Sequence, residues 1–176
     1  MHESDSEYEV WSDYAIMKQK TQSLRGGKMS ILKNEIPILE FDTERNAVIN
    51  PAHEMLDIKL PSKCVFAFLE DYIEEYAAQN NLKQVAHFIS ATKEYPIYEI
   101  EYKGEEIVLC QAPVGAAAAT QIMDWLIGYG VREIISAGSC GCLEEFSEGT
   151  FLVPYKALRD EGTSYHLCSS FTLYRS

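Results

Sequence analysis

The sequence predicts an α/β domain with a largely parallel or mixed central β-sheet. Short apolar runs over residues 63–69 and 84–92 have the length and composition of buried strands. Residues 116–130 combine strong helix formers with an apolar stripe, which is typical of a helix packed on a core. Because strand-like and helix-like segments alternate along the chain, the α/β class is favoured over all-α and all-β folds.

The first predicted strand and helix follow each other directly. The run KCVFAFL at 63–69 is apolar throughout and predicts a strand buried on both faces. Residues 70–81 then predict a helix that ends at Asn80-Asn81. Its apolar residues recur at helical spacing and are expected to face the core: Tyr72, Ile73, Tyr76 and Ala77.

A second strand and a hairpin come next. Residues 84–92 predict a strand in which His87 is expected to be a hydrogen-bonded core histidine. Residues 95–115 alternate in polarity on both sides of Lys103-Gly104-Glu105, which predicts a β-hairpin with its turn at that tripeptide.

The remaining elements are one helix and two strands. The helix at 116–130 should bury a stripe and end at two glycines. Strands are predicted at 132–136 and 150–155, joined by an acidic loop. The stripe and the terminating glycines are Ile122, Met123, Leu126, Ile127, Gly128 and Gly130.

Three segments make up the predicted domain organisation. Residues 1–28 have no sustained apolar pattern and are expected to be a flexible N-terminal extension. Residues 29–166 form the domain, beginning with a short extended segment at 35–41. Residues 167–176 match no helical or strand pattern and are expected to be a tail.

The amino-acid composition indicates which kinds of binding partner to expect. The chain of 176 residues has 15 Lys and Arg against 27 Asp and Glu, a net charge of −12. Nucleic acids and anionic membranes both need a basic surface, so neither is the expected partner. No apolar run approaches the roughly 20 residues of a membrane span, and the acidic N-terminus does not resemble a signal peptide. We expect a cytoplasmic protein whose five cysteines are reduced.

Small residues follow the strand at 132–136 and are the main candidate site. Uncovered backbone N–H groups at 137–142, with the Ser139 hydroxyl, can hold phosphate or sugar oxygens. Gly115 provides a second glycine turn, which opens onto a helix N-terminus. If the two preceding strands are adjacent, both turns flank one crevice at the carboxyl edge of the sheet. Tight packing of strand against helix is the alternative explanation.

Two other chemistries fit parts of the same region. Ser139, Asp160 and His166 follow the order of an α/β-hydrolase triad, but that nucleophile must be followed by a helix. Cys140 and Cys142 can ligate a metal together with His166 and Cys168, or be small pocket and core residues. The segment ALRDEGTSYH at 157–166 brings charge and an aromatic ring to the same sheet edge.

Three motifs in this order, PVGAAAATQIMDWLIGYGVREIISAGSCGCL, EGTFLVP and ALRDEGTSYH, resemble the purine/uridine phosphorylase family of nucleoside phosphorylases. The resemblance runs from about residue 36 to 166 and implies a phosphorylase/hydrolase-like three-layer α/β domain with a central mixed β-sheet. Residues 29–166 would be its N-terminal two-thirds. The resemblance further implies a homodimer or homohexamer that transfers a pentosyl group from a purine or pyrimidine nucleoside to inorganic phosphate, the co-substrate, without a cofactor or metal.

Site residues carry over position by position from the resemblance. Gly138 and Ser139 correspond to the family's phosphate-binding turn. The family's acidic catalytic residues are expected beyond the end of this chain, so none is assigned here. The positions that correspond to nucleoside-binding residues are Val114, Gly115, Cys140, Gly141, Tyr165 and His166.

Two departures from the family pattern concern positive charge. Ser136 stands where the phosphorylases usually have an arginine, three residues before the serine. Residues 68–77 lack the usual glycine-aspartate-proline-x-arginine loop. Because a serine cannot replace the charge and fork geometry of arginine, we expect weak or no phosphorolysis. A nucleosidase that uses water and a catalytically dead nucleoside-binding or assembly module remain the alternatives.

Overall fold

The computed structural model describes residues 31–44 and 49–167, which belong to two compact units. Met1–Glu44 and Ser164–Ser176 contribute to the first unit, and Arg45–Thr163 form the second. The predicted extension at 1–28 lies outside the described residues, as does the predicted tail except for Leu167. The central sheet lies entirely in the second unit.

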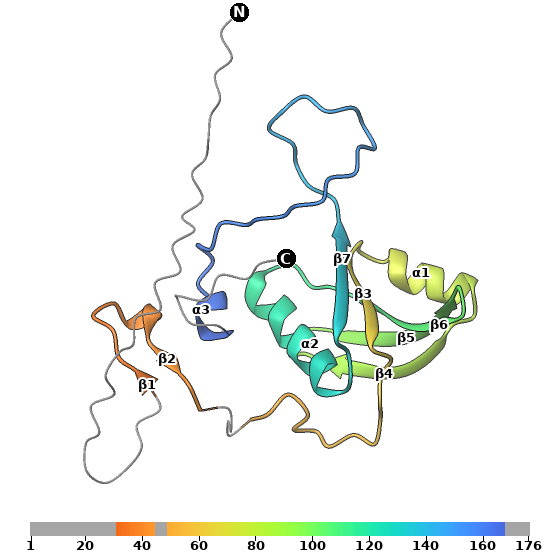
Figure 1. The fold of residues 1–176 in the computed structure, drawn as a ribbon. Helices are drawn as coiled ribbons and strands as arrows, with labels where there is room; N and C mark the ends of the chain where they lie inside the picture. The colour runs from red at the N-terminus through yellow and green to blue at the C-terminus, as the bar shows by residue number, and fades with distance from the viewer. Residues whose placement is uncertain (1–30, 45–48, 168–176) are drawn as a thin grey trace, which may run out of the picture. The chain divides into compact units, whose positions relative to one another are not determined.

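The sheet has five strands in the order β4-β5-β6-β3-β7 (Figure 1). β3 pairs in parallel with β6 on one side and with β7 on the other, whereas β5 is antiparallel to both β4 and β6. The predicted mixed sheet is therefore confirmed. The strands are β3 (Lys63–Phe68), β4 (Lys83–Ile89), β5 (Glu94–Tyr102), β6 (Glu105–Gln111) and β7 (Glu133–Gly138).

Two helices, α1 (Tyr72–Gln79) and α2 (Ala116–Gly128), cover opposite faces of the sheet. Alternate residues of a strand point to opposite faces. Phe66 of β3 accordingly packs in one cluster with Trp125 of α2, while the next residue, Ala67, packs in another with Ile73 of α1. The three-layer α/β architecture is thus confirmed.

Fewer residues of the two helices are buried than the predicted apolar stripes contain. In α1, Ile73 and Ala77 are buried, but Tyr72 and Tyr76 are 73% and 48% exposed. The cluster on this face has few fully buried residues, of which Ile73 is the one from α1. α2 buries more of its surface through Ala119, Ile122, Trp125 and Leu126.

The predicted hairpin is confirmed, and the prediction for His87 is wrong. Lys103 and Gly104 both have positive φ, 53° and 80°, as a type I′ turn between β5 and β6 requires. His87 is exposed, because β4 is the edge strand and the buried position next to it is Phe88.

Two predicted extended segments have other conformations. Residues 150–155 form no strand: the Thr150 backbone N–H donates to the Ser147 carbonyl at 3.2 Å, which closes a turn. In the part of the chain described, β7 pairs with β3 alone, so no strand extends the sheet on that side.

The other segment, at 35–41, belongs to the first unit. It contains the 3₁₀ turn Pro37–Leu39 between β1 (Ile31–Leu32) and β2 (Phe41–Asp42), because proline at a first helical position favours a helical turn. β1 and β2 are antiparallel, and α3 (Ser164–Leu167) contacts β2. Within the described ranges, no helix has the length and apolar character needed to span a bilayer.

Candidate functional site

The carboxyl ends of β3, β6 and β7 lie at the same edge of the sheet, because the three strands are parallel (Figure 1). The strands also end almost level. Ala67 of β3 is paired with Gln111 of β6 and with Ala137 of β7. The segments that follow the three strands therefore start side by side at this edge, which is where α/β sheets generally bind ligands.

The strands that carry the two glycine turns, β6 and β7, are not adjacent, so the condition under which both turns would flank one crevice is not met. β3 lies between β6 and β7, so the turns flank the end of β3. Two strand spacings separate them by about 10 Å. This distance is comparable to the length of a nucleoside, and each turn can thus contact a different part of one elongated ligand.

The turn after β6 leads directly into α2. The first residue of this turn is hydrogen-bonded to β3: the Ala112 backbone N–H donates to the Ala67 carbonyl at 2.7 Å. Val114 is then 92% exposed, and Gly115 is the N-cap residue of α2 with φ of 106°. Glycine adopts this φ without the strain that other residues suffer. Since glycine has no side chain to cap the helix, the first amides of α2 are left for solvent or a ligand.

The turn after β7 combines packing with open space. A Cβ added to Gly138 would lie 3.0 Å from the Cβ of Phe68, so a larger residue here would require β3 to give by a few tenths of an ångström. A Cβ added to Gly141 would meet nothing within 4 Å. Close packing therefore favours glycine at position 138, whereas Ser139, Cys140 and Gly141 are exposed, as the predicted anion cradle requires.

Neither alternative chemistry gains support from the loop after β7. Residues 139–163 contain no helix or strand, so Ser139 lacks the helix that a hydrolase nucleophile needs. Cys140 and Cys142 are both exposed, so neither is a small core residue. Cys168 of the hypothetical four-ligand metal site lies outside the described residues, among which no cluster of three metal-ligating side chains occurs.

Arg132, which directly precedes β7 in the sequence, lies away from the candidate site. Arg132 stands at the amino end of β7, where its Nη1 donates to the Ile127 and Val131 carbonyls at 2.7 and 2.6 Å. A strand of six residues separates this end from Ser139 by about 20 Å. Ser136, in the position of the family's arginine, is exposed and paired with Phe66. Arg132 therefore does not substitute for the missing charge.

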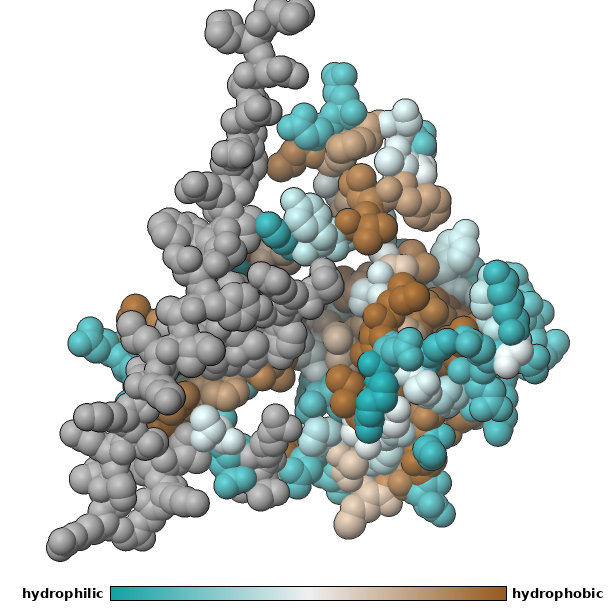
Figure 2. Space-filling model, in the orientation of Figure 1, coloured by the Kyte–Doolittle hydropathy of each residue, from teal (hydrophilic) through white to brown (hydrophobic). Residues whose placement is uncertain are grey.

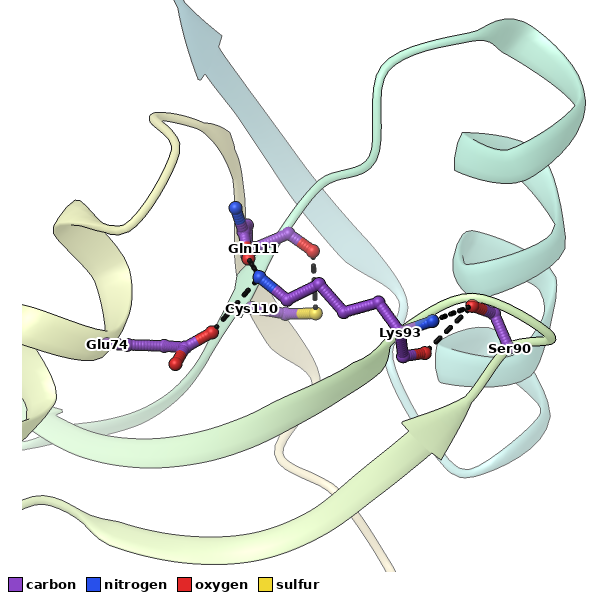
Figure 3. Close-up of polar contacts among 5 residues, drawn as sticks. All are labelled: Glu74, Ser90, Lys93, Cys110 and Gln111. Atoms are coloured by element: carbon purple, nitrogen blue, oxygen red, sulfur yellow. Dashed lines mark hydrogen bonds and ion pairs between the residues drawn. The ribbon is translucent and has the colours of Figure 1, made fainter.

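Lys93 is a cation that the sequence interpretation did not identify. It lies in the turn after β4, whose carboxyl end is at the same edge as that of β6. Figure 3 shows its side chain extending to Gln111, at the end of β6, and to Glu74 of α1. Its Nζ donates to Gln111 Oε1 at 2.6 Å and lies 3.2 Å from Glu74 Oε1. The only signal for it in the sequence is a polar turn after an apolar strand.

The turn that carries Lys93 is held by Ser90. The Ser90 hydroxyl donates to the Lys93 carbonyl at 2.8 Å, and the Lys93 N–H donates to Ser90 Oγ at 3.0 Å (Figure 3). The Ser90 backbone N–H also donates to the Lys93 carbonyl, at 3.0 Å. The ammonium thus has a defined position, with its charge balanced in part by the Glu74 carboxylate. Lys93 thus places a positively charged group next to the carboxyl end of β6.

A pocket of about 180 Å³ lies elsewhere in the second unit, between residues 49–54, the end of β4 and α2. Its carboxylates include Glu54, which accepts a hydrogen bond from Trp125 Nε1 at 3.2 Å, and Asp124. Partial burial raises the pKa of Asp124. These acidic groups would repel phosphate, and the pocket contains none of the residues predicted to bind ligand.

Tyr165 and His166 belong to a different unit from the two turns. Both are in α3 of the first unit, where Tyr165 is half-buried and His166 is exposed. Their assignment to the nucleoside remains a prediction. In contrast, the structure brings Val114, Gly115 and the Gly138–Gly141 segment to one edge of the second unit.

Comparison with known proteins identifies one family. Residues 63–171, more than half of the 176-residue chain, match the family model described as Phosphorylase superfamily. Guanosine phosphorylase of Halorubrum lacusprofundi is 29% identical over 80 residues, which cover 45% of this chain and 33% of that protein. Purine nucleoside phosphorylase of Plasmodium vivax is 29% identical over 79 residues, 44% of this chain and 32% of that protein. The chain spans about a third of the length of these curated relatives.

A solved structure also has local similarity. Purine nucleoside phosphorylase from Toxoplasma gondii, crystallised in complex with immucillin-H, aligns with a TM-score of 0.37 and 20% identity. The alignment covers 47% of this chain and 32% of that one.

Proposed function

Because the chain belongs to the phosphorylase superfamily, we propose that it acts on nucleosides, transferring the pentosyl group to phosphate and releasing the free base. The two relatives are named as phosphorylases of guanosine and of purine nucleosides, which favours a purine nucleoside as substrate. One structural observation carries the proposal: two ligand-accessible backbone turns flank the end of β3 at the carboxyl edge of the sheet.

The spacing of the turns suggests how a substrate would lie. Phosphate would accept hydrogen bonds from the Ser139 hydroxyl and from the exposed amides of Cys140 and Gly141. The pentose would contact the turn at Val114 and Gly115, about 10 Å away across β3. This orientation places the phosphate on the β7 side and the rest of the ligand on the β6 side.

The proposed reaction exchanges one bond for another at the anomeric carbon of the sugar. The glycosidic C–N bond breaks as a C–O bond to phosphate forms, and the departing base takes up a proton. Positive charge develops on the sugar in the transition state, as in other glycosyl transfers. A phosphate held at Ser139 would both stabilise that charge and attack it. The proposal assigns no cofactor and no metal to this reaction.

Serine at position 136 bears on how strongly phosphate would bind. Because position 136 holds serine, the predicted cradle at Ser139, Cys140 and Gly141 offers neutral hydrogen-bond donors, which bind anions less strongly than charged ones. Lys93 is at the β6 end and already has a carboxylate partner. We therefore expect phosphorolysis by the chain itself to be weak. The same feature favours a nucleosidase, which uses water, as the second candidate.

The family also suggests the setting of the protein. We propose that it is cytoplasmic and assembles as a homodimer or homohexamer. Sedimentation velocity on the full chain would test the assembly: a monomer at all accessible concentrations would contradict it.

The decisive experiment measures base release and phosphate binding on the same protein. Guanosine, inosine and uridine would be incubated with and without phosphate, and the free base would be quantified by chromatography. We expect release that depends on phosphate, with purine nucleosides preferred. Release without phosphate would replace this proposal by the nucleosidase, and no release with or without phosphate would contradict both.

Phosphate binding tests the assignment of Ser139. We expect Ser139→Ala to weaken phosphate binding about tenfold, the loss typical of a hydrogen bond to a charged group. Ser62→Ala is the matched control, because Ser62 is exposed and precedes β3 at the opposite, amino-terminal edge of the sheet. Isothermal titration calorimetry would compare the variants with the unchanged protein. Equal affinities for all three would contradict the proposed cradle.

A further inference from the structure

We propose that Cys140 and Cys142 form a redox-active dithiol that closes reversibly into an intramolecular disulfide. Both thiols are exposed, and only Gly141 separates them. They lie in the irregular segment after β7, where no ladder hydrogen bonds hold the backbone. The pair forms a modification site within the turn that the proposed function assigns to phosphate.

The spacing allows the ring to close. The Cα atoms of residues i and i+2 are at most about 7 Å apart in an extended chain, and disulfides join Cα atoms about 4.4 to 6.8 Å apart. A modest bend at the middle residue is therefore sufficient. Gly141 permits that bend, since glycine has wide conformational freedom and its Cβ position is free of neighbours within 4 Å.

Two other cysteines of the second unit are unsuited to oxidation. Cys64 of β3 and Cys110 of β6 are 2% and 0% exposed in the core beneath α2. Burial raises the pKa of the Cys64 thiol to about 12 and also raises the pKa of Cys110, so both remain protonated at neutral pH. Because the thiolate is the reacting species, oxidation should be confined to the exposed pair.

The oxidant is a low-molecular-weight disulfide such as oxidised glutathione. One cysteine thiolate attacks a glutathione sulfur, which breaks the glutathione S–S bond, forms a mixed disulfide and releases one glutathione. The second thiolate attacks the protein sulfur of that mixed disulfide, forming the Cys140–Cys142 bond and releasing the other glutathione. The protein loses two electrons and two protons, and glutathione disulfide is reduced to two thiols.

Closure would alter the candidate phosphate cradle. The ring fixes the peptide units on both sides of Gly141, whose N–H groups the proposed function directs at phosphate. We expect the oxidised protein to bind phosphate several-fold more weakly than the reduced protein. This consequence rests on the proposed function, whereas formation of the disulfide does not.

The test uses the full chain with Cys168→Ser, which removes the one thiol outside the described residues. The protein is equilibrated in mixtures of reduced and oxidised glutathione, and its intact and peptide masses are measured. We expect the loss of two hydrogens, mapped to the peptide with residues 140–142 and reversed by a reductant. Adding Cys140→Ser or Cys142→Ser should instead leave one bound glutathione on the remaining thiol.

Several results would overturn the proposal. Two bound glutathiones, a disulfide between two chains, or modification of Cys64 or Cys110 in the folded protein would each contradict an exposed, mutually reactive pair. Phosphate calorimetry on both redox forms separates the two parts of the argument. Equal binding by both forms contradicts the effect on the cradle, while absence of binding by the reduced form contradicts the proposed function and leaves the disulfide standing.

Discussion

Gly138 and Gly141 show that small residues in one turn have different physical roles. At Gly138 the neighbouring strand is so close that a Cβ would lie 3.0 Å from the Cβ of Phe68. At Gly141 the same atom would project into open space. The first glycine fits the close packing of β3 against β7, and the second leaves room for a ligand or for rotation of the backbone.

Alanine substitutions at these two glycines should separate the roles. We expect Gly138→Ala to lower the free energy of unfolding by about 1 to 3 kcal/mol, the usual cost of inserting a methyl group into a packed site. Gly141→Ala is the matched control and should change it by less than about 0.5 kcal/mol. Urea denaturation followed by circular dichroism measures both. Equal stabilities would mean that β3 and β7 do not approach as closely as the structure shows.

Ser136 and Lys93 both bear on how much positive charge the candidate site has. Ser136 was recognised from the sequence because its position in the motif is that of an arginine. Lys93 was not, because its relevance depends on β4 and β6 ending at one edge, where its ammonium reaches Gln111 at 2.6 Å. A residue far from the motif enters the candidate site only through the pairing of strands.

At the scale of elements, α2 best matches its prediction. It begins after Gly115 and ends at Gly128, and its apolar stripe packs on the face of β3 and β6 that contains Phe66 and Cys110. Periodicity alone, however, does not distinguish the centre of the stripe from its margin. Ile122 is 1% exposed, whereas Ile127 is 43% exposed.

The two isoleucines of α2 therefore have different expected costs of truncation. Ile122→Ala should lower the free energy of unfolding by about 2 to 5 kcal/mol, because it leaves a cavity in the core. Ile127→Ala removes the same atoms from a partly solvated position and should cost less than about 1 kcal/mol. Thermal and urea unfolding of both variants provide the comparison. A larger loss for Ile127→Ala would contradict the orientation of α2.

The segment at 150–155 shows the limit of local pattern. Its composition is that of a strand, but a strand exists only when a neighbour supplies hydrogen bonds. Here the Thr150 N–H is taken by Ser147, and β7 has β3 as its partner in the described part of the sheet. Propensity describes what a segment can form, and pairing decides what it does form.

At the scale of the molecule, the second unit has a well-packed core but an uncovered apolar segment after β7. Figure 2 shows apolar atoms at the surface in the region where Figure 1 draws this segment. Its most exposed apolar residues are more than 75% accessible and close together in sequence: Leu143, Phe151, Val153, Tyr155 and Leu158. Exposed apolar patches favour self-association.

A charge in this segment should reduce self-association without affecting the fold. We expect Val153→Asp to shift association to higher protein concentration, since Val153 is 89% exposed and lies within the apolar run. Met55→Asp is the matched control: it adds the same charge at a residue that is 87% exposed but outside that run. Light scattering against concentration is the measurement. An equal effect of both variants would indicate that net charge, and not this segment, controls association.

The sequence by itself determined the α/β class, the two long hairpin strands, both covering helices and the two glycine turns, because periodicity and turn chemistry are local properties. Only the tertiary structure decided which strands are neighbours. It placed β3 between the two turns, moved His87 to an exposed edge and brought Lys93 to Gln111. Strand order joins residues that are distant along the chain, and no local pattern contains that information.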